Sequence, residues 1–282
     1  MRGIFCTIFK STLASLLADQ QFILFRAIEN FEVYDDDVWI SSFPKTGTTW
    51  TQEMIWCIAN GLDSEQANVP LIQKFPFLDV NYAKNLPRPR FIKTHLPFDL
   101  LPRQIRTGEK NPKIVYVVRN PKDTCISFFH HVLLLEGFQG NFDDFVNLFL
   151  GDRVHYAPFW DNALSFWKRR INDNMLFLKY EDMKRDLPSV IKKTAKFLGK
   201  NLTSDEVAAL NDHLSFASMK KNAAANNAHL ISAVQEITQV KREGEFIRSG
   251  TTEQWKTDMT PEVIQRFDDW IREKSKGTGL TF

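Results

Sequence analysis

The chain has 282 residues, of which 43% are hydrophobic and 13% aromatic, so it can bury a sizeable core in one large α/β domain or two small ones. Its 36 basic and 34 acidic residues leave a net charge of +2, which argues against a general polyanion-binding role and against a nucleic-acid partner. Any anion site must therefore be built locally. Three scattered cysteines, Cys6, Cys57 and Cys125, form neither a disulfide framework nor a metal-ligand spacing, and they suit a reducing compartment.

The N-terminal region contains short apolar runs that could be mistaken for a targeting segment. Lys10 and Asp19 interrupt these runs below the length that a membrane span needs. This favours a helical extension over residues 1–30 instead of a signal peptide or membrane anchor. We therefore expect no membrane partner and a cytoplasmic location.

Four short apolar segments predict strands, and helical patterns separate them. Because these segments show no polar alternation, they indicate strands covered on both faces, as in a parallel sheet. The expected strands span 37–43, 89–95, 112–120 and 174–180, and the expected helices span 48–62, 124–137 and 187–199, each with a glycine near its end. This alternation predicts a single three-layer α/β domain over residues 1–282, with a central parallel sheet.

Two segments lack this regularity. Residues 102–112 are expected to form a basic surface loop. Residues 220–256 are polar and long for a connection inside a compact domain, so we expect a lid or binding loop there. After the third strand, Asn120–Pro121 should turn the chain, and Asp123 or Thr124 should cap the next helix.

The first strand is followed by FPKTGTTW, which combines features of an anion site. In an open parallel sheet, ligands bind beyond the carboxyl ends of the strands, next to helix N-termini with free N–H groups. Lys45 adds a positive charge, Gly47 allows close backbone approach, and Thr46, Thr48 and Thr49 add hydroxyl donors. The stretch is P-loop-like, although the lysine precedes the glycine and so departs from the Walker A pattern. By itself it also fits an ordinary strand-to-helix turn with a threonine cap.

Other strand ends carry similar residue types. Lys93 and His95 stand two apart on the second strand and should face the same way. Arg119 ends the third strand, and Ser127 lies one turn into the helix that follows, so together they predict a second anion site. Tyr180 ends the fourth strand at the same edge.

Together these motifs resemble the cytosolic sulfotransferase family over almost the whole chain from about Phe31. The family's YPKSGTTW is matched by FPKTGTTW, and its RKGxxGDWK is similar to RSGTTEQWK at 248–256. Further matches are KTHLP at 93–97, RNPKD at 119–123, YEDM at 180–183 and SFxxM at 215–219. Each motif is weak alone, but six of them in the family's order are specific.

The resemblance implies transfer of a sulfonyl group from 3′-phosphoadenosine 5′-phosphosulfate (PAPS) to an acceptor hydroxyl or amine. Residues implied to hold the 5′-phosphate are Lys45, Thr46, Gly47, Thr48 and Thr49. Residues implied to hold the 3′-phosphate are Arg119, Ser127, Arg248, Ser249 and Gly250. Around the adenine it implies Trp50, Phe216, Tyr180 and Met219. Trp50 and Phe216 also fit a role as ordinary core residues.

The resemblance also implies the catalytic roles. His95 would remove the acceptor proton as a general base, Lys93 would help orient the transferring group, and Lys45 would neutralise charge on the leaving oxygen. The transfer would be direct and in line, without a metal. The acceptor would be a small hydrophobic phenol, sterol or other alcohol.

The sequence identifies the residues of the acceptor pocket less clearly. Phe77 occupies the position of the family's gating aromatic. It would form an apolar pocket with His95, Phe129 and residues 220–247, joined by Phe128, His130 and Phe138.

Three other functions remain open at this stage. One is a dehydratase that sulfonates an allylic alcohol such as a retinoid and then eliminates sulfate. Another is a non-catalytic nucleotide-binding protein, against which the presence of both Lys45 and His95 argues. A nucleotide kinase fits less well, because its phosphate loop is absent.

Assembly is predicted from the C-terminal segment. Many family members dimerise through KxxxTVxxxE, but here Pro261 and Gln265 replace the valine and the glutamate, and Thr260 looks like a helix cap. We therefore expect a monomer or a weak homodimer.

Overall fold

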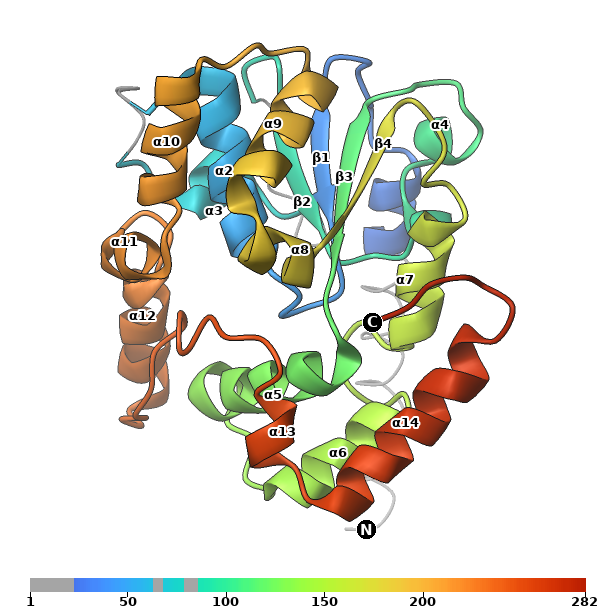
Figure 1. The fold of residues 1–282 in the computed structure, drawn as a ribbon, viewed down its shortest axis with the longest axis vertical. Coiled ribbons are helices and arrows are strands. Elements are labelled where there is room, and N and C mark those ends of the chain that lie inside the picture. The colour runs from blue at the N-terminus through green and yellow to red at the C-terminus, as the bar shows by residue number, and fades with distance from the viewer. Residues whose placement is uncertain (1–22, 63–67, 79–85) are drawn as a thin grey trace, which may run out of the picture.

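The computed structural model describes residues 23–62, 68–78 and 86–282 (Figure 1). Its centre is a parallel four-stranded sheet in the order β2-β1-β3-β4. The strands are β1 (Val38–Ser41), β2 (Phe91–Thr94), β3 (Lys113–Val118) and β4 (Met175–Lys179). Each strand lies inside a segment for which the sequence predicted one. The predicted α/β class with a parallel sheet is confirmed.

Helices connect and surround these strands. They are α2 (Thr48–Asn60), α3 (Leu71–Lys74), η2 (Phe98–Leu100), α4 (Arg103–Arg106), α5 (Pro121–His131), the π-helical turn η3 (Val132–Glu136), α6 (Phe142–Leu150), α7 (Phe159–Trp167), α8 (Tyr180–Arg185), α9 (Leu187–Leu198), α10 (Ser204–His213), α11 (Phe216–Lys221), α12 (Ala228–Thr238), α13 (Trp255–Asp258) and α14 (Pro261–Ser275). Residues 23–29 are also helical, and they are the part of the expected N-terminal extension that lies within the described residues.

Both faces of the sheet are buried, which explains the uninterrupted apolar runs of its strands. Successive side chains of a strand point to opposite faces. Ile40 and Val115 pack in one cluster with residues of α2, α9 and α10, whereas Trp39 and Ile114 pack in a second cluster with residues of α5, α6, α7 and α14. Figure 1 shows α2, α9 and α10 on one side of the sheet and α7 on the other, so the three layers are confirmed.

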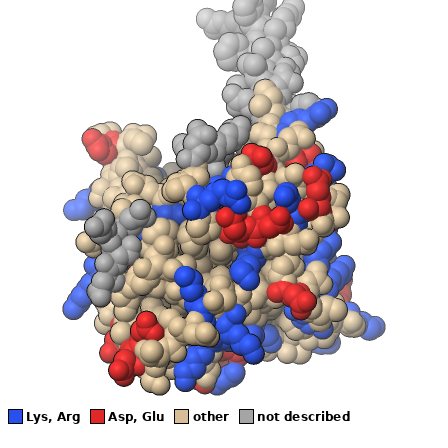
Figure 2. Space-filling model, turned by 90° about the horizontal axis from the view of Figure 1, so that it is seen from above, with Lys and Arg blue, Asp and Glu red and all other residues tan. Residues whose placement is uncertain are grey.

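The carboxyl ends of the strands face a second group of helices. The chain leaves β3 toward α5, and α5, α6, α13 and α14 lie below this edge of the sheet in Figure 1. The face seen from above in that view carries Lys and Arg side chains interspersed with Asp and Glu (Figure 2). Within the described residues, no helix combines the length and the apolar character that crossing a bilayer requires.

Helix α5 differs from its prediction at both ends. It begins at Pro121, and the Asn120 side chain accepts a hydrogen bond from the Lys122 N–H at 3.0 Å, so the expected cap at Asp123 or Thr124 is wrong. The Asp123 carboxylate instead accepts hydrogen bonds from the backbone N–H groups of Glu253 (2.8 Å) and Trp255 (3.2 Å). Asp123 therefore makes a tertiary contact instead of capping its own helix.

The two segments expected to be irregular both contain a helix. Residues 220–256 include α12, and 102–112 include α4. The apolar residues of α12 recur at helical spacing, but none of its residues is buried in the described structure. Ile237, for example, is 82% exposed. The helical period was therefore present in the sequence, and the polar, mixed composition of residues 220–256 led to the prediction of a loop. In contrast, α14 begins as predicted, with Thr260 as its cap and Pro261 at its first position.

Candidate active site

A cavity of about 490 Å³ lies at the carboxyl edge of the sheet. Its walls come from the ends of β1, β2 and β3, from the first turns of α2, α8 and α11, and from the segment before α13. Most of the site residues expected from the sequence line it, namely Lys45, Gly47, Thr48, Thr49, Trp50, Phe77, Lys93, His95, Arg119, Ser127, Tyr180, Phe216, Met219, Arg248, Ser249 and Gly250. Two others, Thr46 and Phe129, do not.

Thr46 has a structural role in the loop after β1. Its side chain is buried, and its Oγ1 lies 2.8 Å from the carbonyl oxygen of Phe43 and 2.9 Å from that of Val117. The hydroxyl therefore fastens the loop to β3 and cannot donate into the cavity. Only the Thr46 backbone remains available to an anion there, which corrects the expectation of a third hydroxyl donor.

Gly47 is required by both its backbone and its surroundings. It has a φ of 108° at the N-cap of α2, and a Cβ placed on it would lie 2.7 Å from Cδ2 of Tyr180. No side chain caps this helix, so the N–H groups of its first turn face the loop with the positive end of the helix dipole. Such a helix start binds phosphate-like anions readily.

Aromatic side chains form a slot beside this loop. Trp50 Nε1 donates to the Leu214 carbonyl at 2.8 Å, and the Trp50 ring meets Tyr180 edge-on at a centroid distance of 5.5 Å. Trp50 and Phe216 are only partly buried, and both line the cavity. Their placement supports a stacking role for the pair more than a purely structural one. A Cβ at Gly250 would overlap the Phe216 ring, so the glycine is needed for this close approach.

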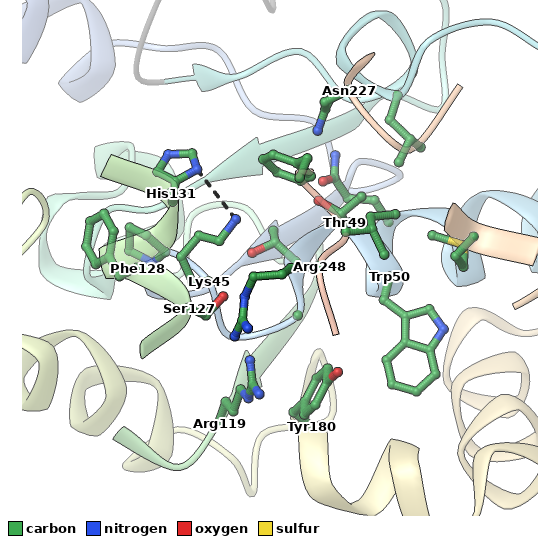
Figure 3. A pocket seen from close by; sticks show the side chains of 18 of the residues that line it. Lys45, Thr49, Trp50, Arg119, Ser127, Phe128, His131, Tyr180, Asn227 and Arg248 are labelled. Atoms are coloured by element: carbon green, nitrogen blue, oxygen red, sulfur yellow. Dashed lines mark hydrogen bonds between the residues drawn. The ribbon is translucent and has the colours of Figure 1, made fainter. Parts of the chain in front are cut away.

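Two arginines face each other at the next part of the wall (Figure 3). Arg119 is 7% exposed, donates through Nη2 to the Thr251 carbonyl at 2.8 Å and packs 4.4 Å from the centre of the Tyr180 ring. Its buried Nε has no hydrogen-bond partner among the described residues. Arg248 donates to Gln254 Oε1 at 2.7 Å. Like charges that converge on one space, with a buried donor left unpaired, fit an anionic ligand.

The cavity is strongly cationic although the chain is nearly neutral. Among the described residues that line it, one carboxylate, Glu136, stands against five cations: Lys45, Lys93, Arg119, Lys184 and Arg248. Burial, followed by the charges of Lys93 and Arg119, lowers the pKa of Lys45 to about 7. A ligand that carries several phosphate or sulfate groups would neutralise this excess charge, so the residues present fit PAPS.

His95 is held as a neutral base. It is 8% exposed, and its Nδ1 lies 2.7 Å from the Ser42 carbonyl, so the ring donates there and Nε2 is the basic nitrogen. Burial, and next the charge of Lys93, keeps the pKa of His95 well below its usual value. Ser42 also contacts Thr48, with 2.6 Å between their hydroxyl oxygens. No sequence pattern identifies Ser42, because its role depends on a backbone carbonyl.

Two aromatic rings lie against the His95 imidazole. Phe77 and Tyr156 each meet the imidazole edge-on at centroid distances of 5.2 Å. Lys93 Nζ lies 4.6 Å from the centre of the Phe77 ring. This end of the cavity can hold an apolar molecule whose polar atom reaches the imidazole. Tyr156 was missed by sequence reasoning because it lies in a loop without a motif.

Phe129 points away from the cavity. Its ring packs against Phe142 and Phe145, at centroid distances of 5.3 and 5.8 Å, on the other face of α5. His130 and Phe138 do not line the cavity either. Phe128 and His131, three residues apart and thus on one helix face, do line it. The helical period could have identified His131 in the sequence.

One group of side chains outside the cavity has the composition of a metal site. Ligand atoms of Glu53, Cys57 and His213 lie within 4.8 Å of one another among the described residues. His213 Nε2 is already 2.7 Å from the Glu53 carboxylate, and the neighbouring Lys74 ammonium would oppose a cation. The expectation that the enzyme needs no metal stays a prediction. Cys57 and Cys125 are free and buried, and Cys6 lies outside the described residues.

Two curated relatives and a family model are named as sulfotransferases. A family model described as a sulfotransferase domain matches residues 35–279. A luciferin sulfotransferase from Photinus pyralis is 40% identical over 278 residues, covering 90% of this chain and 75% of that protein. An amine sulfotransferase from Oryctolagus cuniculus is 36% identical over 267 residues, covering 92% and 87%.

Solved structures agree with the sequence matches. Retinol dehydratase in a complex with retinol and PAP, the desulfonated nucleotide, has a TM-score of 0.83 at 29% identity, covering 91% of this chain and 86% of that one. A mouse sulfotransferase complexed with PAP has a TM-score of 0.72 at 31% identity, covering 90% of both chains. These matches extend over the sheet, the cavity and most of the surrounding helices, so the chain belongs to the sulfotransferase family and is a PAPS-dependent sulfotransferase.

Proposed function

We propose that the chain transfers the sulfonyl group of PAPS directly to the hydroxyl or amine of a small hydrophobic acceptor, such as a phenol, a sterol or another alcohol. One observation carries this proposal. A single cavity has a cationic end, which contains Lys45, Arg119 and Arg248, and an aromatic end. At the aromatic end, the buried His95 imidazole is neutral and can accept a proton.

Different residues of the chain have different roles in the transfer. PAPS supplies an activated sulfonyl group and a stable leaving phosphate. His95 accepts the acceptor proton on Nε2, and the Ser42 carbonyl, which accepts from Nδ1, holds the tautomer and stabilises the imidazolium that forms. The Lys45 ammonium stabilises negative charge at the phosphate end, and Lys93, next to Phe77, helps to orient the transferring group.

Relatives support this class of acceptor without fixing its identity. Two of them are named for sulfonating luciferin and amines. A second candidate is dehydration of an allylic alcohol, which the likeness to retinol dehydratase supports only as a related fold. A role in nucleotide binding alone explains the cations but not the buried imidazole among aromatic rings.

The segment after α12 supports a lid over the cavity. Phe246 lies on Lys45, with 4.0 Å between Nζ and the ring centre, and Arg242 donates to the Leu134 carbonyl at 3.3 Å.

We also infer a monomer or weak homodimer in the cytoplasm, without a nucleic-acid or membrane partner. Pro261 and Val263 are built into α14, where Val263 is buried, which supports this view of assembly. Sedimentation at nanomolar concentration tests it, since a tight dimer would contradict it.

The activity is tested with labelled PAPS and a panel of phenols, sterols, other alcohols, amines and retinoids. We expect label in an organic sulfate or sulfamate of at least one apolar acceptor. Mass analysis of the product separates transfer from dehydration, because dehydration releases inorganic sulfate and an acceptor that has lost water. If PAP binds but no acceptor of the panel is changed, the proposed class of small hydrophobic acceptors is wrong.

A further inference from the structure

Four side chains form a continuous row from Lys45 to the mouth of the cavity, and all four line it. Lys45 Nζ lies 3.5 Å from His131 Nδ1, the contact drawn in Figure 3. His131 Nε2 lies 3.5 Å from one oxygen of Glu136, and the other oxygen lies 3.1 Å from His155 Nδ1. His155 is 72% exposed, so the row ends in solvent.

An unusual backbone brings His131 and Glu136 together. They are five residues apart, and in a regular α-helix residue i+5 would lie about 140° around the axis. The π-helical turn η3 widens the helix between them, and Gly137, with a φ of 74°, ends it. Such turns are rare and often mark functional sites. Here the wider turn places the carboxylate on the same side as the imidazole.

The hydrogen-bonding groups of the row are complementary. The Lys45 ammonium only donates, so Nδ1 of His131 accepts and Nε2 carries the proton toward the Glu136 carboxylate. Burial and the charge of Lys45 lower the pKa of His131 to about 3, which keeps the ring neutral and able to act in this way. The order of groups is cation, neutral imidazole and carboxylate.

The other charged neighbours of Lys45 are mostly unfavourable. Lys93 from β2, Arg119 from the end of β3 and Arg248 from the segment before α13 all act against its positive charge, and burial does so as well. The face of the Phe246 ring gives the ammonium a favourable cation–π contact, and His95 is neutral. Among the described residues of the cavity wall, Glu136 is the carboxylate that opposes these effects.

We propose that His131 and Glu136 are positioning residues for Lys45: the imidazole directs its ammonium group, and the carboxylate behind it supplies the stabilising negative charge. Their use in catalysis rests on the proposed function, because the Lys45 ammonium would serve the anionic end of PAPS. The arrangement itself belongs to the free protein and can be measured there. Neither residue is part of the motifs that define the phosphate loop.

The direct test follows the titration of Lys45 by NMR in ligand-free protein labelled with ¹³C-lysine, with its signal assigned through Lys45→Arg. Glu136→Gln keeps the shape of the side chain and removes its charge. We expect it to lower the titration midpoint of Lys45 by roughly one pH unit. His131→Phe, which keeps a ring but removes both nitrogens, should also lower it. Glu136→Asp should restore most of the wild-type midpoint.

Glu273→Gln is the matched control, because it removes an exposed carboxylate from α14, far from the cavity in sequence and fold. It should leave the midpoint unchanged. Thermal melting of each variant identifies a merely structural effect, which would change stability without moving the midpoint. An unchanged Lys45 midpoint in Glu136→Gln overturns the proposal. A shift in Glu136→Gln but not in His131→Phe overturns the part assigned to the imidazole.

Binding of PAP provides a second measure that does not depend on turnover. A protonated Lys45 favours the anionic nucleotide, so PAP affinity should fall as the pH rises through the Lys45 pKa. In Glu136→Gln this fall should begin at a lower pH, because the pKa is lower. If PAP binds in this way but no acceptor is sulfonated, the proposed function fails and the Lys45 arrangement stands. If the variants change only the acceptor KM, these residues contact the acceptor and the proposal is wrong.

Discussion

The nucleotide end and the acceptor end of the cavity obtain their side chains in different ways. At the nucleotide end, Arg119 and Tyr180 directly follow the carboxyl ends of β3 and β4, and Lys45 lies in the short loop after β1. At the acceptor end, the rings that lie against His95 belong to Phe77 and Tyr156, which come from the loops before β2 and before α7. The sheet edge thus supplies the centre of the nucleotide end, to which Arg248 and Phe216 are added from other segments, whereas the rings of the acceptor end come from loops.

This difference shows what a parallel sheet determines and what it leaves variable. Strand order brings the carboxyl ends of β1, β3 and β4 together, so any residue placed there meets the others whatever the loops do. The acceptor end depends on which way each loop and helix face turns. We therefore expect substitutions to separate cleanly into effects on the nucleotide and effects on the acceptor.

His95→Ala should have the largest effect, because His95 serves the reaction at the junction of the two ends. Loss of a general base lowers turnover by roughly 10²–10⁴-fold. PAP affinity, measured by calorimetry, should stay nearly unchanged, since the imidazole acts on the acceptor proton. His229→Ala removes an exposed histidine of α12 as a control. A His95→Ala enzyme with nearly normal rates would remove this residue from the mechanism.

Gly47→Ala tests how rigidly the nucleotide end is built. The added methyl group would meet the Tyr180 ring, whereas Gly199, also in the left-handed region at the end of α9, has nothing within 4 Å. Gly199→Ala should therefore cost only the backbone strain of about 1–2 kcal/mol in unfolding free energy. Gly47→Ala should cost more and should also weaken PAP binding, as measured by chemical denaturation and calorimetry. Equal effects of the two substitutions would show that the contact with Tyr180 does not matter.

Phe77→Leu and Phe129→Leu test which of these two side chains contacts the acceptor. Phe77 lies against His95, so its substitution should raise the acceptor KM several-fold and leave PAP affinity unchanged. Phe129 packs against Phe142 and Phe145, so its substitution should lower the unfolding free energy by about 1 kcal/mol without a change in KM. The reverse pattern in steady-state kinetics and thermal melts would mean that Phe129 faces the acceptor.

The same contrast explains how far the sequence could predict the molecule. Each strand was visible as an apolar run, and Lys45, Arg119 and Tyr180 were visible because they directly follow such runs. The fold class and the nucleotide end therefore need only local patterns and the rule that ligands bind at the carboxyl edge. A family resemblance then named the ligand.

The remaining residues depend on side-chain direction and tertiary contacts. Thr46 turns its hydroxyl inward to two carbonyl groups, which its neighbours in sequence do not reveal. Asp123 binds backbone groups more than 100 residues away instead of capping its own helix. Glu136 reaches the cavity through a π-helical turn, which has no recognised residue pattern. Only His131 had an unused signal, its helical spacing from Phe128.

The central claim is that the cations at the strand edge recognise the nucleotide through its phosphates, with Arg119 on the 3′-phosphate. Calorimetry of PAP and of adenosine 5′-phosphate with wild-type protein and Arg119→Ala tests it most directly. Removal of this charge-assisted contact should weaken PAP binding by roughly 1.5–3 kcal/mol. Binding of adenosine 5′-phosphate, which lacks the 3′-phosphate, should change little. Equal losses for both ligands, or undiminished PAP affinity in Arg119→Ala, would contradict this assignment.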